Sequence, residues 1–276
     1  MAIDTWDPRQ YDKFQREREQ PFYDLLAMVR PADGMRAVDL GCGTGKLTRV
    51  LHQRVNARET TGIDRSDGML AKTREGPLPA GLRFRVGTIE EFAGLGSAAA
   101  EPAPPGGARA GFDLIFSNAA LHWVDDHRAF LRGAAEHLHP NGRLILSCGG
   151  AGNAAGIIAA LERLISSPVW SVYFTGFEFP YHFYSPDHYA DWLPAANLVA
   201  VRCELVEKDM VHDGPEGLAG WIRTTWMPYT QRVPEDLREK FISDLISEYL
   251  RDHPADSSGH THVQMMRLEV EATKAK

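Results

Sequence analysis

Short β-rich runs alternate with stretches of helical periodicity between residues 36 and 150 of this 276-residue chain. Leu47, Val50 and Leu51, for example, recur at the three- and four-residue spacing of an amphipathic helix. The strands are expected at residues 36–40, 60–63, 82–86, 112–117 and 143–148. Strands that alternate with helices predict a parallel sheet with helices on both faces.

Different patterns follow residue 150. Helices are expected at 185–193 and within 214–252, and strands at 200–206 and 266–273. In the last strand apolar residues alternate with Arg267, Glu269 and Glu271. Such alternation predicts an antiparallel strand with one buried side and one solvent-facing side, which carries these charges.

Together these elements predict an α/β fold with a doubly wound, mostly parallel sheet of seven strands and a helical cap. Residues 1–213 and 258–276 are expected to form the sheet domain, including an N-terminal lid helix, and 214–257 a helical cap insertion. The lid over the site is expected to comprise the N-terminal helix, 150–184 and 214–257.

Composition and charge exclude several classes of binding partner. A formal net charge of −7 repels phosphate backbones, so nucleic acid is not an expected partner. Three widely spaced cysteines and a polar N-terminus favour the cytoplasm. Residues 144–161 are uncharged but rich in glycine, and we read them as a strand, a turn and a helix start, not as a membrane span. His260 and His262 alternate without matching carboxylates, so no metal is expected.

A glycine cluster directly follows the first strand. Gly41, Gly43 and Gly45 lie where the first turn of a doubly wound sheet binds ligands, and glycine lets the backbone approach a ligand closely. A phosphate-binding loop requires Ser or Thr after Gly45-Lys46, but Leu47 is there. The third glycine of a dinucleotide fingerprint is replaced by Lys46. Both of these glycine loops are therefore disfavoured.

Two acids accompany the glycine cluster. Asp64 closes the second strand, where a carboxylate can accept hydrogen bonds from the ribose hydroxyls of an adenosine. Asp39 lies just before the glycines and can attract a cation. The implied ligand has an adenosine, a positive centre and no phosphate. Alternatively, the glycines form a tight turn only and Asp64 caps a helix.

The segments Val38-Asp39-Leu40-Gly41-Cys42-Gly43-Thr44-Gly45, Gly62-Ile63-Asp64 and 112–118 resemble motifs of class I S-adenosylmethionine-dependent methyltransferases, which have a Rossmann-like fold. A narrower similarity, to the trans-aconitate methyltransferase group, rests on Trp6, Pro8, Tyr11, Phe14, Arg18 and Pro21, on Leu121-His122-Trp123, and on Met266-Arg267-Leu268. Juvenile-hormone-acid methyltransferases are more distant. Both groups esterify carboxylates.

The resemblance implies roles in cofactor binding for individual residues. Gly41, Gly43 and Gly45 would pack on the methionine part, Asp39 would face its ammonium group, and Asp64 its ribose. Thr88 and Ile89 would flank the adenine, although Thr88 stands where the family commonly has an acid. Asn118 would lie under the methionine end through its backbone carbonyl. Tyr11 and Arg18 would close the site, and Arg18 could pair with the cofactor carboxylate.

Candidates for the chemistry follow the fourth strand. A carboxylate acceptor needs no general base, whereas a hydroxyl or amine often does, and His122 is the candidate base. Alternatively His122 packs in a turn. Trp123 is either a pocket wall for the methyl donor or the substrate, because an indole face attracts a cationic sulfonium, or a core residue. The aromatic run 173–184, including Tyr184, forms either a substrate pocket or the packing surface between cap and sheet. Arg223 either holds a substrate carboxylate or lies on a solvated helix face.

The function predicted from these features is a cytosolic methyltransferase that uses S-adenosylmethionine to O-methylate the carboxylate of a small organic acid or natural product by direct in-line transfer. Hydroxyl, nitrogen or carbon acceptors are alternatives within the same class. A nicotinamide-dependent oxidoreductase and a cofactor-binding protein without turnover are alternatives from other classes. The oligomeric state is left open.

Overall fold

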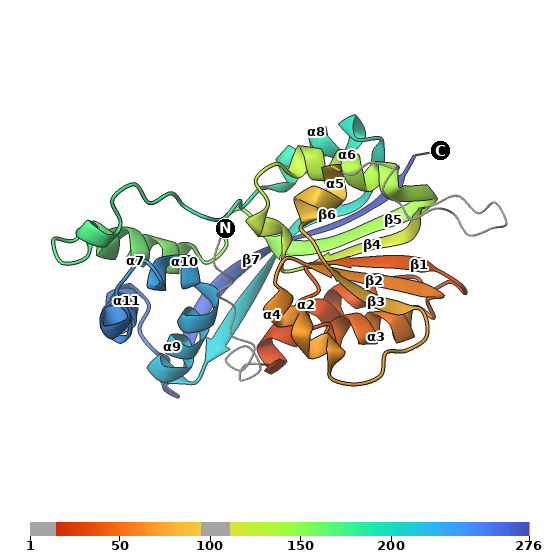
Figure 1. Cartoon of the computed structure of the whole chain (residues 1–276). Helices are drawn as coiled ribbons and strands as arrows, with labels where there is room; N and C mark the ends of the chain where they lie inside the picture. The colour runs from red at the N-terminus through yellow and green to blue at the C-terminus, as the bar shows by residue number, and fades with distance from the viewer. Residues whose placement is uncertain (1–14, 95–110, 276) are drawn as a thin grey trace.

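The computed structural model describes residues 15–94 and 111–275, which build one seven-stranded sheet of order β3-β2-β1-β4-β5-β7-β6 (Figure 1). The strands are β1 (Arg36–Leu40), β2 (Glu59–Asp64), β3 (Leu82–Val86), β4 (Phe112–Asn118), β5 (Leu138–Gly149), β6 (Leu198–His212) and β7 (Thr261–Lys274). Strands β1 to β5 pair in parallel, and β7 runs antiparallel to both β5 and β6. The predicted fold class and the antiparallel last strand are confirmed.

Helices cover both faces of the sheet, as predicted (Figure 1). One face carries α2 (Gln15–Ala27) and α3 (Lys46–Arg54), with α4 (Asp67–Ala71) and the short turn η2 (Lys72–Arg74) nearby; the other carries α5 (Ile89–Gly94), α6 (His127–His137) and α8 (Pro186–Ala195). On the first face Phe22 of α2 packs edge-on against Phe116 of β4. On the second, Phe130 and Tyr189 are buried with Ile115. Pro186 occupies the first turn of α8, where its missing N–H has no partner to lose.

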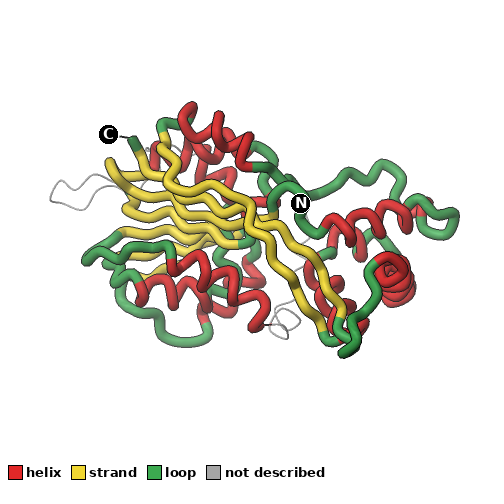
Figure 2. The backbone as a smooth tube through the Cα atoms, turned by 180° about the vertical axis from the view of Figure 1, so that it is seen from behind, coloured by secondary structure: helices red, strands yellow, loops and turns green. Residues whose placement is uncertain are grey.

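A second group of helices lies to one side of the sheet: α7 (Ala155–Ile165), α9 (Gly214–Thr225), α10 (Met227–Thr230) and α11 (Arg238–Asp252), with the short turns η5 (Ser171–Tyr173) and η6 (Glu235–Leu237). They share a core in which Ile157 and Leu161 are buried with Ile222 and Leu245. This cap therefore draws on two chain segments, and α7 packs with the helices of the expected insertion 214–257. Figure 2 shows how the β6–β7 pair continues past the sheet toward the cap.

The charged side of β7 differs from the prediction. Arg267, Glu269 and Glu271 are each less than a tenth exposed, although the alternation placed them in solvent. Strand β7 is hydrogen-bonded on both edges and α2 crosses this side of it, so that Asp24 of α2 bonds Arg267 at 2.9 Å. The buried carboxylates are paired: Glu271 with the largely buried Arg143 of β5, and Glu269 with the partly exposed Arg202 of β6. Period-two alternation distinguishes two faces, but it does not show what covers each one.

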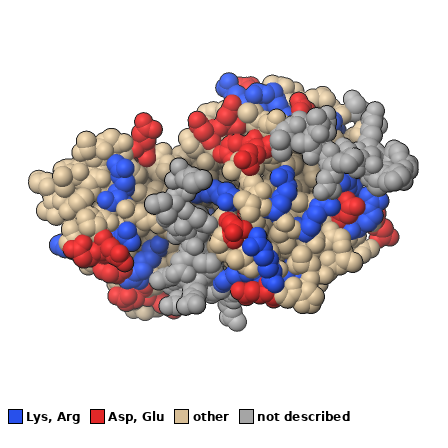
Figure 3. Space-filling model, in the orientation of Figure 1, with Lys and Arg blue, Asp and Glu red and all other residues tan. Residues whose placement is uncertain are grey.

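The exposed surface carries mixed charge. On the face drawn in Figure 3, Lys and Arg side chains are interspersed with Asp and Glu. Within residues 15–94 and 111–275, no helix is both long enough and apolar enough to cross a membrane.

Candidate active site

The turn after β1 has the backbone that its glycines predict. Gly41, Gly43 and Gly45 all have positive φ, at 76°, 56° and 71°. The Gly41 N–H donates to the Ile63 carbonyl at 2.8 Å, which fixes the turn against the end of β2. A Cβ on Gly41 would lie 2.2 Å from the Cβ of Ala120, so only glycine fits there. The turn thus presents bare backbone at the carboxyl ends of the strands.

Asp64 joins this turn to β2. Its Oδ2 accepts a hydrogen bond from the Gly43 N–H at 2.7 Å, and its Oδ1 accepts one from the Ser66 N–H at 2.9 Å. The residue that caps α4 is Ser66, whose hydroxyl accepts from the Met69 N–H at 3.0 Å. Asp64 is therefore not the helix cap of the alternative interpretation, and it brings a carboxylate to the glycine turn.

Asp39 lies behind the turn and is 5% exposed. Its Oδ2 accepts a hydrogen bond from the Thr48 hydroxyl at 2.6 Å. Burial raises the pKa of Asp39 to about 7, against the opposing effect of this hydrogen bond. A nearby cation would restore its charge. Thr48 was not among the predicted site residues, because its position in the first turn of α3 carries no signal of its own.

The end of β4 contributes an unsatisfied acceptor. The Ser117 hydroxyl donates to the Leu40 carbonyl at 2.9 Å, which holds β4 against β1. Ala119 then takes a left-handed φ of 55°, so the chain turns sharply next to Gly41. The Oδ1 atom of Asn118 is buried and has no hydrogen-bond partner among the described residues. Such orphaned acceptors are rare, and this one lies in the residue whose backbone carbonyl was expected to contact the cofactor.

Thr88 and Ile89 follow β3 as expected, but their side chains also have structural roles. The Thr88 hydroxyl accepts from the Glu91 N–H at 3.0 Å, and the Glu91 carboxylate accepts from the Thr88 N–H at 2.9 Å. This reciprocal pair caps α5. Ile89 is buried in the core. Their contact with an adenine stays a prediction.

His122 lies in the short turn η4 (Leu121–Trp123). Its Nδ1 accepts from the Gly149 N–H at 3.3 Å, so the ring proton is on Nε2. Burial, followed by the neighbouring His127, lowers the pKa of His122 to about 4. The imidazole is therefore neutral at pH 7 and acts better as a hydrogen-bond donor than as a base.

Aromatic rings surround His122. Its ring centroid lies 5.7 Å from Trp123, 6.0 Å from Tyr181 and 6.2 Å from Phe183. We call these four residues the aromatic junction, because Trp123, Tyr181 and Phe183 also pack against the cap core. The Tyr181 hydroxyl donates to the Thr225 carbonyl of α9 at 2.8 Å. Much of the aromatic run 173–184 thus forms packing between cap and sheet, which was one of its two interpretations.

Tyr184 and Arg223 have partners outside the aromatic junction. The Tyr184 hydroxyl donates to the Asp125 carbonyl at 2.9 Å, and its ring packs edge-on against Trp192 of α8. Arg223 makes two hydrogen bonds to the Glu239 carboxylate, at 2.9 and 2.5 Å, between α9 and α11. Their roles in substrate binding stay predictions.

Tyr11 and the side chain of Arg18 lie outside the described part of the chain. The backbone of Arg18 belongs to α2, and the next residue, Glu19, bonds the Lys46 ammonium at 2.5 Å. Because Lys46 follows Gly45 directly, the first turns of α2 lie beside the glycine turn.

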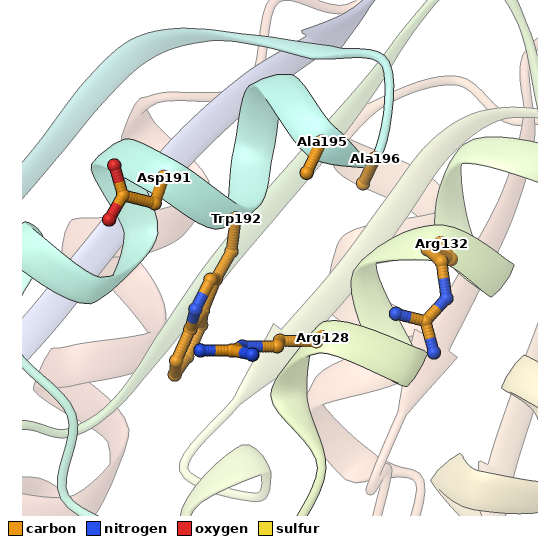
Figure 4. Close-up of a pocket in the computed structure, with 6 residues that line it drawn as sticks. All are labelled: Arg128, Arg132, Asp191, Trp192, Ala195 and Ala196. Carbon is orange, nitrogen blue, oxygen red and sulfur yellow. The ribbon is translucent and has the colours of Figure 1, made fainter.

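A separate open cavity of about 370 Å³ lies between α6 and α8 on the outer face (Figure 4). Arg128, Arg132, Asp191, Trp192, Ala195 and Ala196 line it. None of these residues belongs to the glycine turn or the aromatic junction. In the described ranges, no three His, Cys, Asp or Glu side chains are placed to hold a metal ion.

The strand order, the glycine turn and the acid at the end of β2 define a Rossmann-like methyltransferase. A family described as "Methyltransferase domain" matches residues 31–167. A trans-aconitate 2-methyltransferase of Deinococcus radiodurans is 33% identical over 83% of this chain and 84% of its own length. One of Variovorax paradoxus is 29% identical over 98% of both chains. The chain belongs to the methyltransferase family of these enzymes, as its motifs indicated.

Solved structures support the fold. The YcgJ protein of Bacillus subtilis has a TM-score of 0.57 at 17% identity, covering 94% of this chain and 99% of its own. An S-adenosylmethionine-dependent methyltransferase of Mesorhizobium loti has a TM-score of 0.51 at 19% identity, covering 92% and 97%. The family assigns the protein to methyl transfer and not to the nicotinamide chemistry that was the alternative.

Proposed function

We propose that the protein binds S-adenosylmethionine at the glycine turn and transfers its methyl group to a carboxylate oxygen of a small organic acid. The main observation in support of this cofactor site is the 2.7 Å hydrogen bond from the Gly43 N–H to Asp64 Oδ2. It brings bare backbone and a carboxylate together at adjacent strand ends. The cofactor, when bound, supplies a methyl group that its positive sulfur already activates.

The residues present fit this cofactor. The positive φ values of Gly41, Gly43 and Gly45 produce a turn of bare backbone that the cofactor could approach closely. Asp64 would accept from the ribose hydroxyls, because an ionised carboxylate offers about four lone-pair sites. Asn118 Oδ1, buried and unpaired, would accept from an ammonium group. Asp39 would add a negative charge behind the turn. Thr88 and Ile89 flank the adenine, and Tyr11 and Arg18 close the site, in the same proposal.

The protonation state of His122 supports a carboxylate acceptor. With a pKa of about 4, His122 is a poor base for a hydroxyl or an ammonium group, whereas a carboxylate is ionised at pH 7 and needs no base. Its Nε2–H is suited to donate to an acceptor oxygen and orient it. Trp123 supplies an aromatic face beside it. The relatives named trans-aconitate 2-methyltransferase agree with this acceptor class.

The test of the acceptor is a mass-spectrometric screen of carboxylic acids, phenols and amines with S-adenosylmethionine, in which only acids are expected to gain one CH₂ unit. Exclusive methylation of phenols or amines would refute the acceptor class. A cytosolic location, and a reaction that needs no metal, nucleic acid or membrane, belong to the same proposal.

The test of the cofactor site is calorimetry with S-adenosylhomocysteine. Asp64→Asn should weaken binding about 10- to 100-fold, because hydrogen bonds to a charged group are lost. Asp67→Asn is the matched control, since Asp67 is an exposed acid three residues away that pairs with Arg74. Equal affinities for both variants would place the ribose elsewhere.

A further inference from the structure

Arg65 extends from the end of β2 to the aromatic junction. It directly follows Asp64, and its guanidinium carbon lies 5.6 Å from the centroid of the Trp123 ring. The Trp123 ring is in turn 4.7 Å from the Tyr181 ring. The side chain therefore spans from the carboxylate proposed to bind the ribose to the rings beside which the acceptor is proposed to bind.

The charge of Arg65 is not neutralised within the described chain. No carboxylate of residues 19–94 or 111–275 lies within ion-pairing distance of its guanidinium. The neighbouring acids are engaged: Asp64 accepts from two backbone N–H groups, and Asp67 bonds Arg74 at 2.8 Å. Arg223, by contrast, is held by Glu239. A cation without a counter-ion at a ligand site favours an anionic ligand and disfavours an amine.

We propose that Arg65 determines acceptor specificity by binding a second carboxylate of the acceptor, one that is not methylated. This inference rests on the proposed function. A guanidinium binds a carboxylate bidentately through two parallel N–H groups. If it bound the reacting carboxylate, it would occupy both oxygens and reduce their nucleophilicity. The carboxylate on Arg65 is therefore a different one, and the enzyme prefers di- and tricarboxylic acids to monocarboxylic acids.

The experiment compares Arg65→Gln, Arg65→Lys and wild type on three alkenoic acids that differ in carboxylate number: trans-aconitate, glutaconate and crotonate. Arg65→Gln should raise KM for the tri- and dicarboxylate about 10- to 100-fold, which is the loss expected for a charge-assisted hydrogen bond, and should change KM for crotonate less than about threefold. Arg65→Lys keeps the charge without the planar fork and should be intermediate. The affinity for S-adenosylhomocysteine should not change.

Arg128 provides the matched control. Its guanidinium carbon also lies over an indole, 5.1 Å from the Trp192 ring, but in the outer cavity between α6 and α8 (Figure 4). Arg128→Gln should leave all three KM values unchanged. The inference is overturned if Arg65→Gln leaves the tri- to monocarboxylate ratio intact, or weakens only S-adenosylhomocysteine binding, which would make Arg65 a cofactor contact. If wild type methylates crotonate but neither the tri- nor the dicarboxylate, the inference is overturned while the proposed function stands. If no carboxylic acid of the wider screen gains a methyl group, the proposed function fails, and the inference fails with it.

Discussion

At Gly41 the backbone combines a positive φ with a contact that leaves no room for a side chain. Its φ is 76°, and an added Cβ would meet Ala120 Cβ at 2.2 Å. Gly34 has nearly the same φ of 75° but has nothing within 4 Å of an added Cβ. Gly34→Ala should therefore cost only the left-handed backbone term, about 1–2 kcal/mol. Gly41→Ala should cost roughly 1–3 kcal/mol more in unfolding free energy, because its methyl group also overlaps Ala120 in the turn that follows β4.

Urea unfolding at pH 7 measures the unfolding free energies of both variants and of wild type. Gly41→Ala should also weaken S-adenosylhomocysteine binding, whereas Gly34→Ala should not. Equal losses of stability in the two variants would mean that Ala120 moves aside freely, and the turn would then not be held by this contact.

The neutral state of His122 predicts a level pH profile. With a carboxylate acceptor and saturating cofactor, kcat/KM for the acceptor should stay level between about pH 6 and 9, since the acceptor and His122 keep their protonation states there and the bound ammonium group keeps Asp39 ionised. His122→Asn can still accept from the Gly149 N–H but lacks the Nε2–H, so kcat/KM should fall about tenfold, the value of one hydrogen bond. His122→Gln places an amide N–H near Nε2 and should recover part of this loss. A wild-type profile that rises through pH 6 to 7 and becomes level in His122→Asn would instead identify a general base.

Among the elements, β7 carries ionic pairs that a single substitution can break. Glu271 is 8% exposed and bonds Arg143 at 2.5 Å, and Arg143 also donates at 2.9 Å to the carbonyl of Met28, the residue that follows α2. Glu271→Gln leaves a buried guanidinium without its counter-charge, which should cost about 3 kcal/mol of unfolding free energy. Glu204, whose side chain is 53% exposed, pairs with Arg202 on β6, and Glu204→Gln should cost less than about 0.5 kcal/mol. Comparable losses in denaturant titrations of the two variants would contradict the importance of burial.

Strands β1 to β5 could be predicted to within a few residues, apart from the earlier start of β5, because buried parallel strands are short apolar runs with polar ends. The last two strands are longer than predicted: β6 covers Leu198–His212 and β7 Thr261–Lys274, against 200–206 and 266–273. Much of β6 is exposed, so its sequence lacks the alternation that marks a half-buried strand. Backbone pairing with β7 maintains it, and backbone pairing leaves no trace in side-chain type.

The candidate site, like the sheet, could be predicted from the sequence only in part. The glycine turn and Asp64 could be predicted because each follows a strand directly, and parallel strands end at one edge of the sheet. The contacts of Thr48 with Asp39, His122 with Gly149, and Arg65 with Trp123 could not. They depend on which segments become neighbours and on side-chain direction, neither of which a local pattern encodes.

At the scale of the whole molecule, two buried groups on opposite faces of the sheet titrate in opposite senses. His127, 1% exposed, accepts from the Tyr189 hydroxyl and donates to the Leu121 carbonyl, and burial lowers its pKa from 6.5 to about 4. The unfolded chain therefore binds a proton first, and His127 reduces stability as the pH falls from about 6.5 to 4. Burial raises the pKa of Asp39 from 3.8 to about 7, so the folded protein binds this proton first and gains stability as the pH falls through that range.

These opposing shifts predict how two variants differ from wild type between pH 7.5 and 5. At pH 5 each shift is worth up to about 2 kcal/mol, so the wild-type unfolding free energy should change little through these two groups. Asp39→Asn should be roughly 1–4 kcal/mol more stable than the ligand-free wild type at pH 7.5, lose more than half of that advantage at pH 5, and bind S-adenosylhomocysteine more weakly. His127→Gln removes the opposite contribution, so relative to wild type it should gain stability on acidification. Urea titrations at both pH values measure these differences, and parallel changes in all three proteins would show that neither group titrates as its burial requires.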